Sequence, residues 1–301
     1  MRTPLLACPW AGPPGRLLLK PENLQATGSF KIRGAYNAVG ALSPDRQRAG
    51  VVTYSSGNHG QAVAYAAHAF GVPCVVVMND DAPAVKVAAV RTLGADIVPV
   101  PLAERVARAE ELVRDKGYML VPPFAHPDVV AGQGTVGLEI LEDAPTTDVV
   151  LVPVGGGGLA SGVATAVKAI RPSAAVIGVE PDLAADAAES LRTGVLTAWP
   201  AAMTSRTIAD GLRPTGLSEL TFAHLRERLD GIVTVTEEHI RSAVGVLART
   251  AHLVAEPSGA VALAAYLYRR DRLPDGYTVA VVSGGNVDPR LLAGILSLPS
   301  G

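Results

Sequence analysis

Residues 20–35 of the chain read KPENLQATGSFKIRGA, and Lys31 stands where the pattern of this stretch changes. The apolar run Leu17–Leu19 before it is typical of a strand, and from Lys31 onward the apolar residues follow helical spacing. We therefore expect the lysine amine at a loop-to-helix junction. Between Phe30 and Ile32 an amine would lose hydration in a closed site, which favours formation of a Schiff base. A surface lysine at the start of a helix is the simpler alternative.

The composition is that of an α/β protein acting on a small molecule. Of the 301 residues, 49% are hydrophobic and 18% are charged, with a net charge of −2. Such a chain has no basic footprint for nucleic acid or an anionic membrane, so neither is expected as a partner. We find no signal peptide and no apolar run near the roughly 18 residues of a membrane span. The two cysteines, Cys8 and Cys74, match no disulfide framework or metal spacing, which favours the cytoplasm.

Short β-branched runs alternate with stretches of helical spacing, which is typical of βαβ units and a parallel sheet. Several runs are apolar at successive positions, as expected for strands covered on both faces. The predicted strands are Leu17–Lys20, Val51–Tyr54, Cys74–Met78, Ile97–Val100, Val149–Val154, Val176–Val179, Ile232–Val235 and Thr278–Val282. We predict a small domain over residues 45–125, inserted in a larger domain made of residues 1–44 and 126–301.

Polar stretches follow several of these strands, at the positions where open α/β sheets bind ligands. The first, SSGNHGQ at residues 55–61, precedes a helix. Successive backbone N–H groups at such a place form an anion site, which suits a substrate carboxylate. A plain turn in which Asn58 caps the helix is the alternative.

Two further stretches carry glycines after a strand. Residues 152–162 read VPVGGGGLASG, and four glycines let the backbone wrap a phosphate at a helix N-terminus. A dinucleotide site is the competing interpretation; Glu180 supports it, but the glycines lack the G-x-G-x-x-G spacing. Residues 281–288 read VVSGGNVD, where the Ser283 hydroxyl can bond an aromatic nitrogen without being charged.

An amine, a carboxylate cradle, a phosphate cradle and a neutral partner for a ring nitrogen together describe a pyridoxal phosphate site. From about Thr3 to Asp288 the sequence resembles the fold type II pyridoxal-phosphate enzymes, and within them the threonine dehydratase and serine racemase family. GSFKIRGA, SGNHGQ, the four glycines and SGGNVD follow in family order. Cysteine synthases share the fold but typically have threonine where His59 stands. The resemblance implies two open, twisted parallel-sheet domains, like the β subunit of tryptophan synthase, with the cofactor between them.

The resemblance also implies the roles of individual residues. Lys31 would carry pyridoxal 5′-phosphate and remove the α-proton of the substrate, while Phe30 packs on the ring. Asn58 would bond the 3′ oxygen of the cofactor, and Ser283 its ring nitrogen. The phosphate would be held by Gly155, Gly156, Gly157, Gly158 and Leu159. The substrate would contact Ser55, Ser56, Gly57, Asn58 and His59.

Ser56 and Phe124 give opposite indications about the reaction. In serine racemases a serine at the place of Ser56 is the acid/base opposite the lysine, because reaction at two faces needs two proton donors. Phe124, in the run Pro122-Pro123-Phe124, resembles the threonine dehydratases, since racemases tend to have asparagine there. We give elimination more weight than racemisation.

The segment from Glu180 to Asp186 is a candidate cation site. Glu180, the carbonyl of Ala184 and Asp186 resemble the divalent cation site of the metal-dependent racemases. Oxygen ligands suit Mg²⁺ or Ca²⁺, with Mn²⁺ a further candidate. Acidic residues capping the following helix are the alternative.

The sequence thus predicts a cytoplasmic ammonia-lyase that acts by β-elimination on L-threonine or L-serine to give a 2-oxo acid and ammonia. A serine or hydroxyaspartate racemase with dehydratase side activity is the alternative. A regulatory protein without turnover and a nicotinamide-dependent oxidoreductase are the rival classes. The resemblance further implies a homodimer. We expect no appended regulatory domain after Asp288 to Leu296, and the helix that commonly precedes the lysine stretch in the family is not found.

Overall fold

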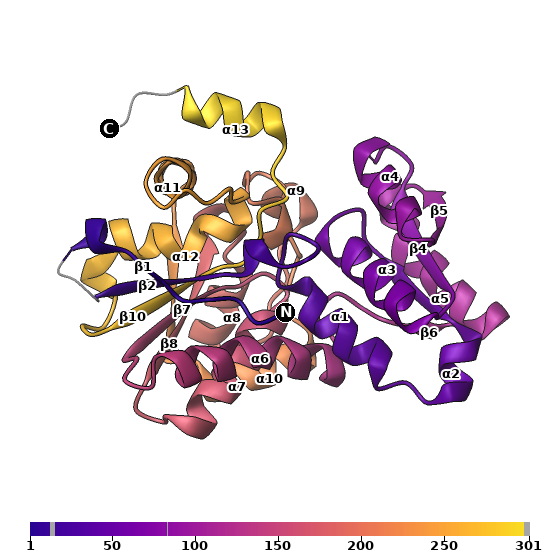
Figure 1. Ribbon diagram of the computed structural model, residues 1–301, viewed down its shortest axis with the longest axis horizontal. Coiled ribbons are helices and arrows are strands. Elements are labelled where there is room, and N and C mark those ends of the chain that lie inside the picture. Colours follow the sequence, from indigo (N-terminus) through magenta and orange to yellow (C-terminus); the bar gives the residue numbers. More distant parts are fainter. Residues whose placement is uncertain (13–15, 83, 298–301) are drawn as a thin grey trace. The chain divides into compact units, whose positions relative to one another are not determined.

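The computed structural model describes residues 1–12, 16–82 and 84–297 (Figure 1). The chain divides into two compact units. One contains Met1–Phe30 and Gly134–Gly301, and the other contains Lys31–Gln133. Each unit has its own sheet.

The first unit contains a six-stranded sheet with the order β1-β2-β10-β7-β8-β9. Its strands are β1 (Leu6–Ala7), β2 (Leu17–Pro21), β7 (Val149–Pro153), β8 (Ala175–Pro181), β9 (Gly231–Val235) and β10 (Thr278–Val282). Strand β1 is antiparallel to β2, and all other pairs are parallel. The last strand, β10, pairs with β2 on one side and β7 on the other, so the carboxyl ends of three sequence-distant strands lie side by side.

Helices cover both faces of this sheet (Figure 1). They are α6 (Pro127–Asp143), which crosses the unit boundary, α7 (Gly158–Ile170), α8 (Asp186–Thr193), α9 (Ala201–Thr204), α10 (Glu219–Arg228), α11 (Glu237–Arg249), α12 (Pro257–Tyr268) and α13 (Pro289–Leu296). In β7, Val149 and Leu151 pack with α11 and α12, whereas Val150 and Val152 pack with α6, α7 and α10. Because side chains alternate along a strand, two covered faces require the continuous apolar run seen in the sequence.

The second unit contains a parallel four-stranded sheet with the order β5-β4-β3-β6. Its strands are β3 (Val51–Tyr54), β4 (Cys74–Asn79), β5 (Asp96–Val100) and β6 (Met119–Leu120). Its helices are α1 (Lys31–Gly40), α2 (Pro44–Ala49), α3 (Asn58–Phe70), α4 (Ala84–Thr92) and α5 (Arg105–Lys116). Apolar side chains of α1, α3 and α4 pack on one face of the sheet, and those of α5 pack on the other.

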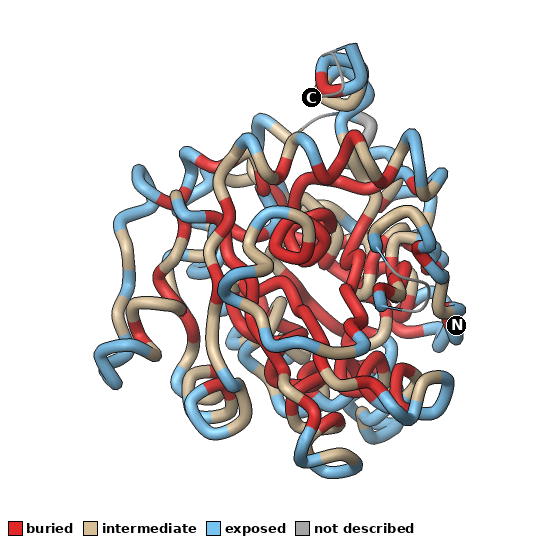
Figure 2. Tube along the Cα trace, turned by 90° about the vertical axis from the view of Figure 1, so that its left-hand side faces the viewer, coloured by how far each residue is buried: buried red, intermediate tan, exposed pale blue. Residues whose placement is uncertain are grey.

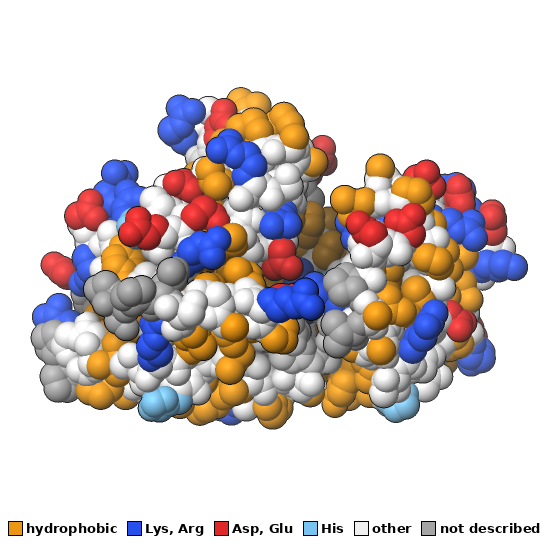
Figure 3. Space-filling model, turned by 90° about the horizontal axis from the view of Figure 1, so that it is seen from above, with side chains coloured by type: hydrophobic (Ala, Val, Ile, Leu, Met, Phe, Trp, Pro, Cys, Tyr) orange, Lys and Arg blue, Asp and Glu red, His pale blue; other side chains and the backbone are white. Residues whose placement is uncertain are grey.

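The remaining helical segments are short 3-10 turns at Pro9–Ala11, Glu22–Leu24, Leu102–Glu104, Asp182–Ala184, Asp210–Leu212 and Arg270–Arg272. The central strands β7 and β10 are buried along their whole length, and so is most of α12, whereas exposed residues lie mainly on loops and on the outer faces of other helices (Figure 2). Positive and negative side chains are interspersed on the face seen in Figure 3. No helix in the described part of the chain is long and apolar enough to cross a membrane.

All eight predicted strands are present, within a few residues at their ends. The prediction missed β1 and β6, which have two residues each and therefore carry no readable alternation. The unit boundaries lie at 30/31 and 133/134, whereas the predicted domain boundaries were 44/45 and 125/126. Helix α1 accounts for the first difference, because its apolar face packs with α3 in the core of the second unit.

A buried polar network fixes the chain just before the lysine stretch. Lys20 is fully buried, and its Nζ donates to Glu139 Oε2 at 2.6 Å and to the Thr3 carbonyl at 2.7 Å. The Thr3 hydroxyl in turn donates to Glu22 Oε1 at 2.6 Å. A buried ammonium is tolerated only when it is paired and hydrogen-bonded, as here. The network therefore joins the N-terminal residues to β2 and α6.

Candidate active site

Lys31 is the first residue of α1, and Phe30 precedes it. Lys31 is partly buried, and its Nζ donates to the carbonyl of Pro123 at 2.8 Å. Phe30 belongs to the other unit, where its backbone N–H donates to the Ser283 carbonyl at 3.0 Å. The Phe30 ring packs against a core cluster that includes Leu159 and Val281. The lysine amine therefore has a fixed acceptor within its own unit.

The loop Ser55–Gly57 connects β3 to α3 in the same unit as Lys31. Gly57 is the N-cap of α3 and has no side chain with which to cap it, and its own N–H donates to the Ser55 Oγ at 3.2 Å. A Cβ on Gly60 would lie 2.3 Å from the Ser55 carbonyl, so the loop can fold over the first turn only because residue 60 is glycine. A helix that begins after a glycine N-cap can offer the N–H groups of its first turn to an anion.

His59 lies beneath this loop. It is 2% exposed, and its ring Nε2 is 2.9 Å from the Val121 carbonyl. A carbonyl only accepts, so Nε2 carries the hydrogen, and Nδ1 has no hydrogen-bond partner among the described residues. Burial, and then the charge of Lys31, lower the pKa of His59 to about 3. The imidazole is therefore neutral at pH 7.

Ser56 does not project freely from the loop. Its hydroxyl donates to the side-chain oxygen of Asn79, and it accepts the Asn79 backbone N–H at 3.1 Å. Asn79 is the last residue of β4, and the sequence alone gave no reason to connect it with Ser56. A polar residue at a strand end is a weak signal without knowledge of which loop lies beside it.

The four glycines lie at the carboxyl end of β7, in the first unit. Gly157 has a φ of 84° and is the N-cap of α7, and no side chain caps this helix. A Cβ on Gly157 would lie 2.9 Å from side-chain atoms of Leu217 and Thr221, so both the backbone angle and the packing require glycine. Gly158 and Leu159, the first residues of α7, are buried. An uncapped helix of 13 residues behind a glycine loop fits a phosphate group.

Ser283 follows β10 directly, beside the glycine loop in sheet order. It is 4% exposed, and its Oγ donates to the Ser258 carbonyl at 3.3 Å. The Ser258 hydroxyl accepts the Gly211 N–H at 2.8 Å, and Gly211 packs closely against Gly155. Ser258 therefore connects the glycine loop with Ser283. Sequence reasoning gave Ser258 no role, because its partners Ser283 and Gly211 lie 25 and 47 positions away in the chain.

The start of α12 also packs closely against the loop that follows Ser283. A Cβ on Gly259 would lie 2.2 Å from the Gly284 carbonyl oxygen. The Glu256 N–H donates to the same oxygen at 3.1 Å. The backbone after Ser283 is therefore held in one conformation.

The two acidic residues predicted as cation ligands lie close together, but they do not form a complete set of ligands. Glu180 is fully buried at the end of β8, and its carboxylate accepts the Ala187 and Ala188 N–H groups at 3.2 and 2.8 Å. It thus caps α8, as in the alternative interpretation. Asp186 is 2% exposed, and its Oδ2 has no hydrogen-bond partner among the described residues. Ala184 is buried in the preceding 3-10 turn.

The electrostatics of these two carboxylates favour their neutral forms. Burial, and then the charge of Asp186, raise the pKa of Glu180 well above its usual value. Burial raises the pKa of Asp186 to about 7. No group of three or more histidine, cysteine, aspartate or glutamate side chains in the described residues could hold a metal ion. A cation here would need backbone carbonyls or water as further ligands.

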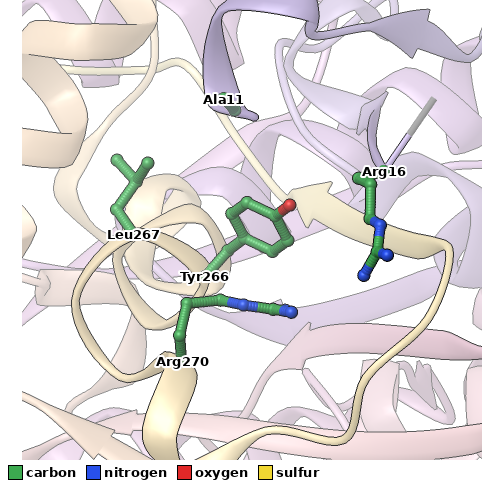
Figure 4. Close-up of a pocket in the computed structure, with 5 residues that line it drawn as sticks. All are labelled: Ala11, Arg16, Tyr266, Leu267 and Arg270. Atoms are coloured by element: carbon green, nitrogen blue, oxygen red, sulfur yellow. The ribbon is translucent and has the colours of Figure 1, made fainter. Parts of the chain in front are cut away.

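A separate pocket of about 430 Å³ lies in the first unit, lined by Ala11, Arg16, Tyr266, Leu267 and Arg270 (Figure 4). The Arg270 guanidinium lies 4.8 Å from the centre of the Tyr266 ring. Arg16 immediately precedes β2, and Tyr266 lies near the end of α12, so the pocket is at the amino ends of the strands. The glycine loop and Ser283 follow the carboxyl ends of their strands, at the opposite end of the sheet's strands.

Residues 1–285 match the family described as "Pyridoxal-phosphate dependent enzyme". The chain is 40% identical to an L-threo-3-hydroxyaspartate ammonia-lyase of Saccharomyces cerevisiae, covering 94% of this chain and 86% of the relative. It is 43% identical to an L-threonine ammonia-lyase of Thermotoga maritima, over 94% of this chain and 70% of the relative.

The solved structure of maize serine racemase superposes with a TM-score of 0.91 at 37% identity, covering 98% of this chain and 91% of that one. These likenesses, with the motifs held at the carboxyl ends of β3, β7 and β10, identify the fold and confirm the resemblance found in the sequence. The chain is a fold type II pyridoxal-phosphate dependent enzyme and belongs to the threonine dehydratase and serine racemase family.

Proposed function

We propose that the protein is an ammonia-lyase that eliminates the β-hydroxyl of L-threonine or L-serine, giving a 2-oxo acid and ammonia. The observation that carries this proposal is the buried Ser283 hydroxyl after β10, in a chain about 40% identical to ammonia-lyases of hydroxy amino acids. A hydroxyl can bond a ring nitrogen without giving it a full charge. That arrangement favours prompt loss of the β-hydroxyl over a long-lived carbanion.

The chain's own residues would divide the work as follows. Bound pyridoxal phosphate supplies the electron sink that makes the α-proton acidic. Lys31 would hold the cofactor and take the α-proton on its amine, which Pro123 now keeps in place. Phe30 would pack on the ring, and Asn58 would bond its 3′ oxygen. The N–H groups from Gly155 to Leu159 would bind the phosphate, because α7 has no side-chain cap.

The loop from Ser55 to His59 would bind the substrate carboxylate. Its support is the glycine N-cap of α3, Gly57, where an added Cβ would meet nothing within 4 Å, so that the helix start is open to a ligand. The first unit would then serve as the cofactor-binding domain and the second as the substrate-binding domain. We propose the cytoplasm as the location, because both cysteines are buried and free, and a homodimer as the assembly, on the resemblance alone.

We also propose that the protein binds a divalent cation. Glu180, the Ala184 carbonyl and Asp186 would bind Mg²⁺, or Ca²⁺ or Mn²⁺, with water completing the shell. The supporting observation is that burial makes both carboxylates costly to ionise, and the charge of Asp186 adds to the cost for Glu180, which a cation would offset.

Racemisation is the second candidate function. Ser56 favours it, because a hydroxyl on the other face of the substrate could return the proton there. The likeness to maize serine racemase is a further reason to test it.

One experiment separates these functions. The purified protein is incubated with pyridoxal phosphate, and its absorbance near about 410 nm is recorded. Release of 2-oxo acid is then measured from L-threonine, L-serine and 3-hydroxyaspartate, with chiral analysis of recovered serine and a chelator control. We expect 2-oxobutanoate from L-threonine. A colourless protein would contradict the cofactor assignment, and D-serine without 2-oxo acid would favour the racemase.

A further inference from the structure

The contact between Ser56 and Asn79 continues the sheet beyond the end of β3. The last strand residue of β3 is Tyr54, and the next backbone bond runs from the Ser55 N–H to the Val77 carbonyl at 3.1 Å. Two residues further along β4, the Asn79 N–H has a side chain as its acceptor, the Ser56 hydroxyl, at 3.1 Å. Ser56 is thus held by the backbone of the neighbouring strand.

The Asn79 side chain adds a second bond whose direction is fixed by Asp81. The Asn79 Nδ2 donates to Asp81 Oδ1, and a carboxylate only accepts. The amide oxygen must therefore be the end that faces Ser56. Because that oxygen also only accepts, the hydrogen bond between the two side chains has to use the Ser56 proton.

Asn79 therefore engages the Ser56 hydroxyl both as a hydrogen-bond donor and as an acceptor. Its proton lies toward Asn79 Oδ1, and one of its lone pairs takes the Asn79 N–H. To give its proton to a carbon atom, Ser56 must first break the bond to Oδ1.

We propose that Asn79 is a positioning residue that restrains the Ser56 hydroxyl and so sets the ratio of racemisation to elimination. This inference rests on the proposed function, in which Lys31 serves elimination and Ser56 the return of a proton on the other face. With Asn79 intact, the bound Ser56 proton is withheld, and elimination prevails. Removal of the amide oxygen frees that proton while leaving Lys31 and the glycine loop untouched.

The test compares the wild-type enzyme with Asn79→Ala, loaded with pyridoxal phosphate and given L-serine. The ratio of D-serine to 2-oxo acid should rise about three- to tenfold in the variant, as expected for loss of one hydrogen bond. The Ser56→Ala and Ser56→Ala/Asn79→Ala proteins should show equal, low ratios, because Asn79 acts only through Ser56. An unchanged ratio in Asn79→Ala would overturn the inference.

A second variant guards against misfolding at Asn79. Asp81 is exposed, and Asp81→Leu removes the acceptor that orients the amide. The amide can then turn its nitrogen toward Ser56, so the ratio should rise here too, by less than in Asn79→Ala. A ratio in Asp81→Leu equal to that of the wild type would contradict the role of Asp81 in orienting the amide.

Amide hydrogen exchange on the cofactor-free protein measures the contact without catalysis. The Asn79 N–H should exchange about tenfold faster in Ser56→Ala than in the wild type, since its acceptor is gone. Equal exchange rates would refute the contact. The two proposals fail differently: wild-type protein that releases no 2-oxo acid overturns the proposed function, whereas release with an unchanged D-serine ratio in Asn79→Ala overturns only the role of Asn79.

Discussion

The Lys31 amine donates a 2.8 Å hydrogen bond to the carbonyl of Pro123, a residue 92 positions further along the chain. Pro123 lies in the run Pro122-Pro123-Phe124, in which only Phe124 bears on the choice between elimination and racemisation. The bond gives the amine a defined position within its unit. The proposed chemistry depends on this amine, which belongs to the first residue of α1.

Replacing Lys31 by alanine should abolish the absorbance near about 410 nm and lower 2-oxo acid release from L-threonine by about 10²–10⁴-fold. The reason is that both cofactor attachment and α-proton removal are assigned to one amine. Lys116→Ala is the matched control, because this exposed lysine ends α5 and should behave as wild type. Retention of the band or of the wild-type rate in Lys31→Ala would contradict the assignment.

A methyl group on Gly259 should destabilise the protein by about 1–3 kcal/mol, because it would meet the Gly284 carbonyl oxygen at 2.2 Å. Gly294→Ala is the matched control in α13, where an added Cβ meets nothing within 4 Å. There, the better helix former should stabilise by about 0.5–1 kcal/mol. Urea denaturation of both variants gives the two free energies of unfolding. If both substitutions changed the free energy of unfolding in the same direction, the contact between Gly259 and Gly284 would not be tight.

His59 should make the protein less stable as the pH falls. In the unfolded chain its pKa is near 6.5, whereas burial lowers it to about 3 in the folded protein. Between these values the unfolded state binds the proton and the folded state does not, so stability is lost from about pH 6.5 downward. His59→Gln can still donate to Val121 and does not titrate. Its melting temperature should therefore fall less than that of the wild type between pH 6.5 and pH 4.

If the melting temperatures of the wild type and of His59→Gln changed in parallel with pH, the assigned role of His59 would be wrong. Other groups titrate in the same range, but they are common to both proteins. The difference between the curves therefore isolates His59.

Addition of Mg²⁺ should raise the melting temperature of the wild-type protein, since a ligand that binds only the folded state stabilises it. Asp186→Asn should lose this response, because one of the two buried carboxylates is gone. Asp182→Asn is the matched control, an exposed neighbour in the preceding 3-10 turn, and should respond as wild type. An equal response in all three proteins would exclude Asp186 as a ligand.

Much of the fold follows from local sequence pattern. The continuous apolar run of β7 indicated a strand covered on both faces, and α11 and α12 on one side with α6, α7 and α10 on the other provide that cover. The family was identified from the lysine stretch and the glycine loops, because these motifs follow one another in the order typical of the family. Strand β6 escaped notice, since two residues show no period.

The sequence by itself therefore determined the longer strands, the polar loops that follow them and the cofactor of the family. Only the tertiary structure decided which residues support the loops: Pro123 at the Lys31 amine, Ser258 behind Ser283, and Asn79 at the Ser56 hydroxyl. The physical reason is that periodicity and turn chemistry act between neighbours in the chain. These three contacts join residues 92, 25 and 23 positions apart, and packing of whole elements brings them together.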